Sequence, residues 1–166
     1  GRIGSAMEIG HLPVVPDGAR CGCGRRGCLE TVASRLAIAG EAAQAAIRGE
    51  APRLLKLAGA DLSRLKSGVL AQAIKGGDRV VEQLVRRAAG WLGYGIAGVA
   101  HLLAPDTVVL GGGLVEEFPA LYLQEVAAAL RARGLPAFTD GLRLTVADLG
   151  ADAVALGAAA LAAEAA

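Results

Sequence analysis

Residues 8–30 read EIGHLPVVPDGARCGCGRRGCLE, and they hold all three cysteines of the chain and one of its two histidines. The four residues are His11, Cys21, Cys23 and Cys28. The glycines and prolines between them disfavour regular helix and favour tight turns, so the loop needs something other than a backbone ladder to order it. Three thiolates and one imidazole complete a tetrahedral zinc shell. The spacing therefore predicts a structural zinc site whose binding free energy orders the loop.

The alternative interpretation is a surface loop with three free thiols, in which Cys21 and Cys23 form at most a redox pair. The loop has few hydrophobic residues that would bury free thiols, and this interpretation leaves His11 unexplained. An odd number of clustered cysteines also argues against a disulfide framework. We therefore favour the metal site.

The composition is that of one compact domain, residues 1–166, with 54% hydrophobic but only 3% aromatic residues. The 17 Lys and Arg nearly balance the 16 Asp and Glu, so charge gives no support to nucleic-acid binding through this segment. The start, GRIGSAME, lacks a signal-peptide pattern, and the most apolar stretch, 91–104, is too short to span a bilayer. We expect a cytoplasmic protein with no membrane partner.

After residue 30 the pattern changes to amphipathic helices and short strands. Apolar spacing predicts helices over 31–49, 51–59, 67–78, 78–105, 119–134 and 151–166, and strands within 106–113 and 142–149. The helix over 78–105 is expected to be buried nearly all round after Trp91, with His101 as a core histidine, and to stop at Pro105. This order predicts an α/β fold, with residues 1–30 as a loop and 31–166 as its helical and α/β body.

A glycine turn, Gly111, Gly112 and Gly113, follows the first predicted strand in the sequence TVVLGGGL. Three glycines let a ligand approach the backbone, but they are also typical of a tight strand-to-helix turn. The spacing does not match G-x-G-x-x-G, because Glu116 occupies the third glycine position. From the residues alone, a nucleotide contact and a simple turn both stay open.

Three segments resemble the ROK family of bacterial repressors, unclassified open reading frames and sugar kinases. They are EIGH with CGCGRRGCLE, then TVVLGGGL, and then ADLGADAVALGAAAL, in the family's order from residue 8 to the final helix. The resemblance implies the C-terminal lobe of an actin-like, ribonuclease H-like ATPase fold with long helices and a zinc-binding loop. Residues 49–78 resemble glucokinase-like members, which we favour.

The resemblance also implies roles for individual residues. The family's zinc ligands match His11, Cys21, Cys23 and Cys28, its sugar-binding residues match Glu8, His11 and Glu30, and its adenosine-side glycines match Gly111, Gly112 and Gly113. A carboxylate accepts hydrogen bonds from sugar hydroxyls, although an acid at a helix start, such as Glu30, also has an ordinary dipole role. The implied ligands are a hexose, with glucose favoured, and ATP with Mg²⁺ in the complete protein. The implied assembly is a homo-oligomer, either a dimer or a tetramer.

The catalytic base of the family's kinases is absent from this sequence. Those kinases use an Asp-x-Gly-Gly-Thr turn and an Asn-Asp pair before EIGH, and neither occurs here. We therefore assign no catalytic residue, and we expect the chain to be part of a longer protein and inactive alone.

Three functions stay open at this point. In the first, which the intact glycine turn favours, the chain is the C-terminal part of an ATP-dependent sugar kinase. In the second, it is the sugar-sensing domain of a repressor of the same family. The third is a zinc-stabilised interaction module that folds by itself.

Overall fold

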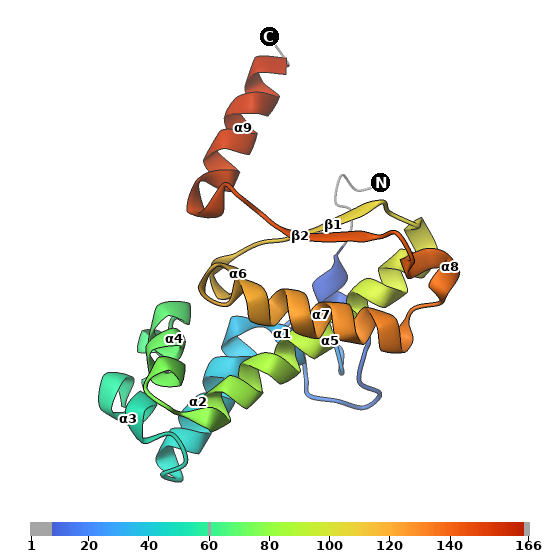
Figure 1. Cartoon of the computed structure of the whole chain (residues 1–166). Coiled ribbons are helices and arrows are strands. Elements are labelled where there is room, and N and C mark those ends of the chain that lie inside the picture. The colour runs from blue at the N-terminus through green and yellow to red at the C-terminus, as the bar shows by residue number, and fades with distance from the viewer. Residues whose placement is uncertain (1–7, 60, 165–166) are drawn as a thin grey trace.

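The helix α5 (Arg79–Leu103) runs through the middle of the structure, and the other elements are arranged along it (Figure 1). The computed structural model describes residues 8–59 and 61–164. Residues 1–7 of the predicted loop and the last two residues of the predicted final helix lie outside these ranges. Helix α5 ends two residues before Pro105, as the proline predicts, and Ala104 between them is left-handed, with a φ of 44°.

The remaining elements are shorter than α5. The α-helices are α1 (Glu30–Ala33), α2 (Arg35–Ile47), α3 (Pro52–Ala58), α4 (Ser67–Lys75), α6 (Gly113–Glu117), α7 (Pro119–Arg133), α8 (Pro136–Thr139) and α9 (Ala153–Glu164). The strands are β1 (Thr107–Leu110) and β2 (Arg143–Val146), and single 3-10 turns occupy Ile9–His11, Leu62–Arg64 and Gly150–Asp152. The order of helices and strands confirms the predicted α/β arrangement, and α6 and α8 are additions.

The helix predicted over 31–49 is divided at Ser34. The backbone of Ser34 is extended, with a ψ of 156°, and its hydroxyl accepts a hydrogen bond of 3.2 Å from the N–H of Ala37. This is an N-cap contact, which satisfies one of the free donors at the start of α2. The break therefore separates the short α1, which follows the cysteine loop, from the helical body.

Helix α7 packs very closely against the backbone of α5. A Cβ atom added to Gly93 of α5 would lie 2.6 Å from the Cβ of Ala129 and 2.9 Å from the backbone of Val126, both in α7. Glycine at this position is what allows the two helices to approach so closely. On the far side of α7 from α5, β1 and β2 pair in parallel, with Thr107 opposite Arg143 (Figure 1).

A buried carboxylate joins α3 to the start of α5. Asp78 is 3% exposed, and its two oxygens accept hydrogen bonds from the N–H groups of Arg53 (3.2 Å) and Leu54 (2.7 Å). Asp78 thus caps α3, although it lies at the N-terminus of another helix. Sequence spacing does not reveal this contact, because it joins residues 24 and 25 positions apart.

The prediction that α5 is buried nearly all round after Trp91 is wrong. Leu102 is 81% exposed and Leu103 58% exposed, because the apolar end of the helix extends beyond the elements of the described chain that pack on it. His101 is also not a core residue. It is half-buried, its Nε2 accepts a hydrogen bond of 2.9 Å from the N–H of Leu135, and its ring packs edge-to-face on Phe138.

The final helix, α9, extends away from the rest of the molecule (Figure 1). None of its described side chains is buried, and Val154 and Leu161 are 84% and 69% exposed. Within residues 8–59 and 61–164, no helix has both the length and the apolar character needed to cross a membrane.

Candidate metal centre and ligand-binding loop

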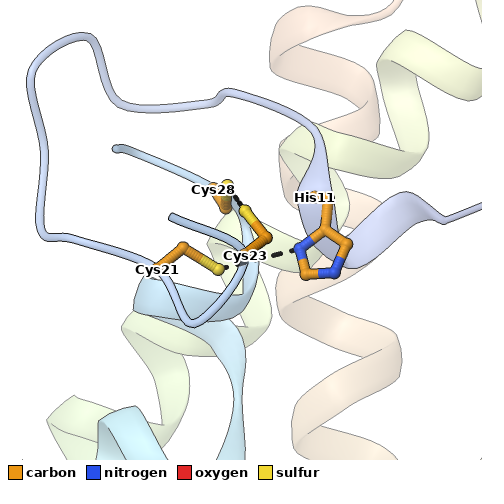
Figure 2. A group of neighbouring side chains, drawn as sticks. All are labelled: His11, Cys21, Cys23 and Cys28. Carbon is orange, nitrogen blue, oxygen red and sulfur yellow. Dashed lines mark hydrogen bonds between the residues drawn. The ribbon is translucent and has the colours of Figure 1, made fainter. Parts of the chain in front are cut away.

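The structure brings together the four residues that the sequence singled out. The donor atoms of His11, Cys21, Cys23 and Cys28 all lie within 4.8 Å of one another. The Sγ atoms of Cys23 and Cys28 are 3.6 Å apart, and the Sγ of Cys21 is 3.7 Å from the Nδ1 of His11 (Figure 2). The prediction that these side chains form one cluster is confirmed.

The backbone of the loop folds back on itself to make this cluster. Isolated antiparallel bridges pair Pro13 with Cys28 and Arg20 with Arg26, so the two sides of the loop run next to each other. Gly27 holds the sides together, since its carbonyl accepts from the N–H of Val14 at 2.8 Å and its own N–H donates to the carbonyl of Ala19 at 3.0 Å. The cysteines thus converge from two sides of one hairpin-like loop.

Glycine is required at position 27. Its φ is +73°, and a Cβ atom there would lie 1.8 Å from the carbonyl oxygen of Val15, which is an impossible contact. Gly22 lies in the same loop between two cysteines, but a Cβ there would meet nothing within 4 Å. Only the first of these two glycines is a steric requirement of the loop.

The cluster fits a zinc ion. A tetrahedral zinc with ordinary bond lengths separates its ligand atoms by about 3.5 to 3.8 Å, close to the 3.6 and 3.7 Å found here. All three cysteines are free thiols, and the donor set of three sulfurs and one imidazole nitrogen is one that zinc prefers. Zinc would be held by these four residues and would complete its shell with them, leaving no position for a reacting water.

The thiols differ in their ease of ionisation. A hydrogen bond from the backbone of Arg25 lowers the pKa of Cys23, which lies at the exposed side of the cluster. Burial, together with the neighbouring thiols, raises the pKa of Cys28 to about 11. A metal ligand must be a thiolate, so before a metal binds the deprotonation of Cys28 is less favourable than that of Cys23.

Leu29 anchors the loop to α5. Its side chain is 2% exposed, and a Cβ added to Gly95 of α5 would lie 2.7 Å from its Cδ2. Leu29 stands between Cys28, which belongs to the cluster, and Glu30, which begins α1. Burial of this one side chain therefore fixes both neighbours relative to the helical body.

Glu30 lies beside the metal cluster and faces solvent. Its Oε2 is 3.8 Å from the Nδ1 of His11, and its side chain is 53% exposed. His11, Glu30, Thr31 and Ser34 line an open cavity of about 660 Å³ together with the cysteine loop. Glu8 does not join them, because it lines a separate apolar cavity with Leu102 and Leu103 at the end of α5.

The glycine turn forms another cavity. Gly111, Gly112 and Gly113 line a space of about 330 Å³, whose other walls include Ala33, Arg35, Ser67 and Tyr122. Ser34 lines the His11 cavity, whereas its neighbours Ala33 and Arg35 line the glycine-turn cavity. The break between α1 and α2 therefore contributes to the walls of both cavities. Arg35, Ser67 and Tyr122 carry no motif in the sequence, and only the packing of α2, α4 and α7 places them at this turn.

The sequence and the fold are similar to those of known proteins. The model of the ROK family matches residues 1–165. A glucokinase of Halalkalibacterium halodurans is 36% identical over 160 residues, covering 93% of this chain and 46% of its own length. The DNA-binding transcriptional dual regulator NagC of Escherichia coli K12 is 30% identical over 149 residues, covering 90% of this chain and 35% of its own.

A solved structure supports the same assignment. The ROK family glucokinase from Streptomyces griseus, crystallised with glucose and AMPPNP, superposes with a TM-score of 0.77 at 34% identity. The match covers 93% of this chain and 50% of that chain. The chain thus spans about half the length of the curated glucokinases it matches.

These matches confirm the architecture expected for the C-terminal portion of an actin-like fold, mostly helical with a small parallel sheet and a Cys/His cluster. With the family model extending over residues 1–165, the chain belongs to the ROK family.

Proposed function

We propose that this chain forms the C-terminal part of an ATP-dependent hexose kinase, with glucose as the favoured sugar. The observation that carries the proposal is the position of Glu30, whose carboxylate stands 3.8 Å from His11 at the edge of the metal cluster and opens to a cavity. A carboxylate held in this way accepts hydrogen bonds from adjacent sugar hydroxyls. The similarity to glucokinases over 93% of the chain supports the same activity.

In this proposal, residues 8–30 form the zinc and sugar loop and the rest of the chain forms its body. Zinc on His11 and the three cysteines orders the loop and thereby places His11 and Glu30 to contact the sugar. The sugar contact of Glu8 stays a prediction, because Glu8 lines a separate cavity. The glycines at 111–113 take the adenosine side of ATP. A structural metal thus acts here by positioning the groups that bind substrate.

Replacing Glu30 by glutamine tests the sugar contact. The change keeps the size of the side chain but removes its charge, and hydrogen bonds to charged groups are worth about 1.5–3 kcal/mol. We expect the zinc-loaded variant to bind D-glucose at least about tenfold more weakly than the parent chain in an NMR titration. Glu164→Gln, at the exposed end of α9, is the matched control and should bind as the parent does. Equal affinity of all three proteins, or no glucose-dependent shift in the parent, contradicts the proposal.

The chain by itself should not phosphorylate glucose. The sequence contains neither the Asp-x-Gly-Gly-Thr turn nor the Asn-Asp pair that supply the base and the phosphate contacts in the family's kinases. Without a group to accept the hydroxyl proton, we expect no turnover above background in a coupled assay with ATP, Mg²⁺ and glucose. Turnover near an ordinary kinase rate, about 10 per second, would show that the base lies within these 166 residues.

The second candidate is the sugar-sensing part of a transcriptional repressor. It is favoured by the 30% identity to the regulator NagC over 90% of this chain. The same loop would then bind a sugar without phosphorylating it. The gene sequence directly upstream of Gly1 separates the two candidates, because a basic helix-turn-helix indicates a repressor and an Asp-x-Gly-Gly-Thr turn without one indicates a kinase.

A further inference from the structure

Tyr122, near the start of α7, lines the cavity beside the glycine turn. Its side chain is only 3% exposed, and its ring belongs to the hydrophobic core together with neighbours such as Val126. The cavity of about 330 Å³ that it borders also includes Gly111–Gly113 and Ser67. A Cβ on Gly113 would lie 2.9 Å from the Oγ of Ser67, so the hydroxyl of this serine lies directly against the turn.

The hydroxyl of Tyr122 has no hydrogen-bond partner among residues 8–59 and 61–164. A tyrosine buried to this degree usually finds one. The hydroxyl is also not sealed in the core, because the described chain contains no fully enclosed side-chain oxygen or nitrogen without a partner. The hydroxyl of Tyr122 is therefore accessible as well as unpaired, and the glycine-turn cavity is one that Tyr122 lines.

We propose that Tyr122 is a specificity-determining residue of the nucleotide site, whose hydroxyl donates a hydrogen bond to the nucleoside part of the bound ligand. This inference rests on the proposed function, which places ATP at the glycine turn. Adenosine offers acceptors of the right kind in its ring nitrogens and ribose oxygens. A site built around a fixed donor rejects ligands that leave this donor unpaired.

The packing of the ring makes the hydroxyl a preorganised donor. Because the ring is held in the core, little side-chain entropy is lost when a ligand binds. Burial raises the pKa of Tyr122 to about 12, and the hydroxyl, like that of any tyrosine at neutral pH, carries a proton to donate. An ordinary core tyrosine would show neither the open donor nor its position next to three glycines.

The test is Tyr122→Phe in the zinc-loaded chain, with adenosine and ATP as probes and the backbone N–H signals of Gly111–Gly113 as the NMR readout. The substitution removes only the hydroxyl, so we expect the melting temperature to stay within about 2 °C of the parent. We expect the affinity for both adenosine and ATP to fall by a similar factor, about threefold to tenfold. Tyr94→Phe is the matched control, because Tyr94 lines a different groove between α5 and α7, where Arg133 stacks on its ring.

Each outcome has a distinct meaning. If neither adenosine nor ATP shifts the glycine signals of the parent, the nucleotide site of the proposed function fails, and this inference fails with it. If the parent binds both ligands and Tyr122→Phe binds them equally well, the site stands but Tyr122 has no part in it. If the variant weakens ATP alone, the hydroxyl contacts a phosphate group, which overturns the nucleoside contact.

Discussion

Cys28→Ser is expected to remove zinc from the protein and to unfold the loop over residues 12–28 while the helices of the body remain folded. Cys28 is 1% exposed and lies 3.6 Å from Cys23, so a serine there leaves a buried hydroxyl that does not replace a thiolate ligand. In small zinc domains the metal contributes about 10–16 kcal/mol at neutral pH, and this free energy is also folding free energy. We expect zinc affinity to fall at least about 100-fold.

Two measurements check this result. Metal analysis should give about one zinc per parent chain and close to none for the variant. Hydrogen exchange should show lost protection at Val14, Cys21 and Gly27, whose N–H groups donate within the loop. A parent chain stripped by a chelator should behave like the variant, and added zinc should restore only the parent. A variant that keeps its zinc, or a parent whose loop exchange ignores zinc, would exclude the metal site.

Gly27→Ala should disrupt the same loop without touching a ligand. The left-handed backbone at Gly27 costs alanine about 1–2 kcal/mol, and the 1.8 Å approach to the carbonyl of Val15 forces the backbone apart as well. Separation of the two sides breaks the bonds from Val14 and to Ala19 that hold the cysteines together. We expect zinc affinity to fall at least about tenfold and the sugar affinity to fall with it.

Gly22→Ala is the matched control, since it makes the same change in the same loop where there is open space and no positive φ. It should bind zinc and glucose as the parent does. Competition with a chromogenic zinc chelator measures both variants under one condition. Equal zinc affinities for the two variants would show that the loop closes around the metal in another way.

The metal cluster could be predicted because the four residues that form it lie close together in the sequence. His11 and the three cysteines lie within 18 consecutive residues, so a short loop closure brings them together at little entropic cost. Their scarcity elsewhere in the chain made the pattern specific. The structure confirms the cluster; the ion itself, the sugar contacts of Glu8, His11 and Glu30 and the adenosine contact of Gly111–Gly113 stay predictions.

The helices were predictable for a related reason, since their periodicity is a local property and their stop signals, such as Pro105, are single residues. Their burial was not. Leu102 and Leu103 are as apolar as the core residues of α5, and only the placement of the other elements leaves them in solvent. Apolar periodicity shows which face prefers burial, not which neighbour covers it.

The Cys/His loop, the α/β body and the resemblance to the ROK family can all be read from the amino-acid sequence. The packing of the helices places Glu30 in one cavity with His11 and Glu8 in another, and it brings Tyr122 to the cavity that Gly111–Gly113 line. The difference comes from distance along the chain. Ligands in one loop are brought together by turn geometry, whereas the walls of a cavity come from separate helices whose packing depends on the whole core.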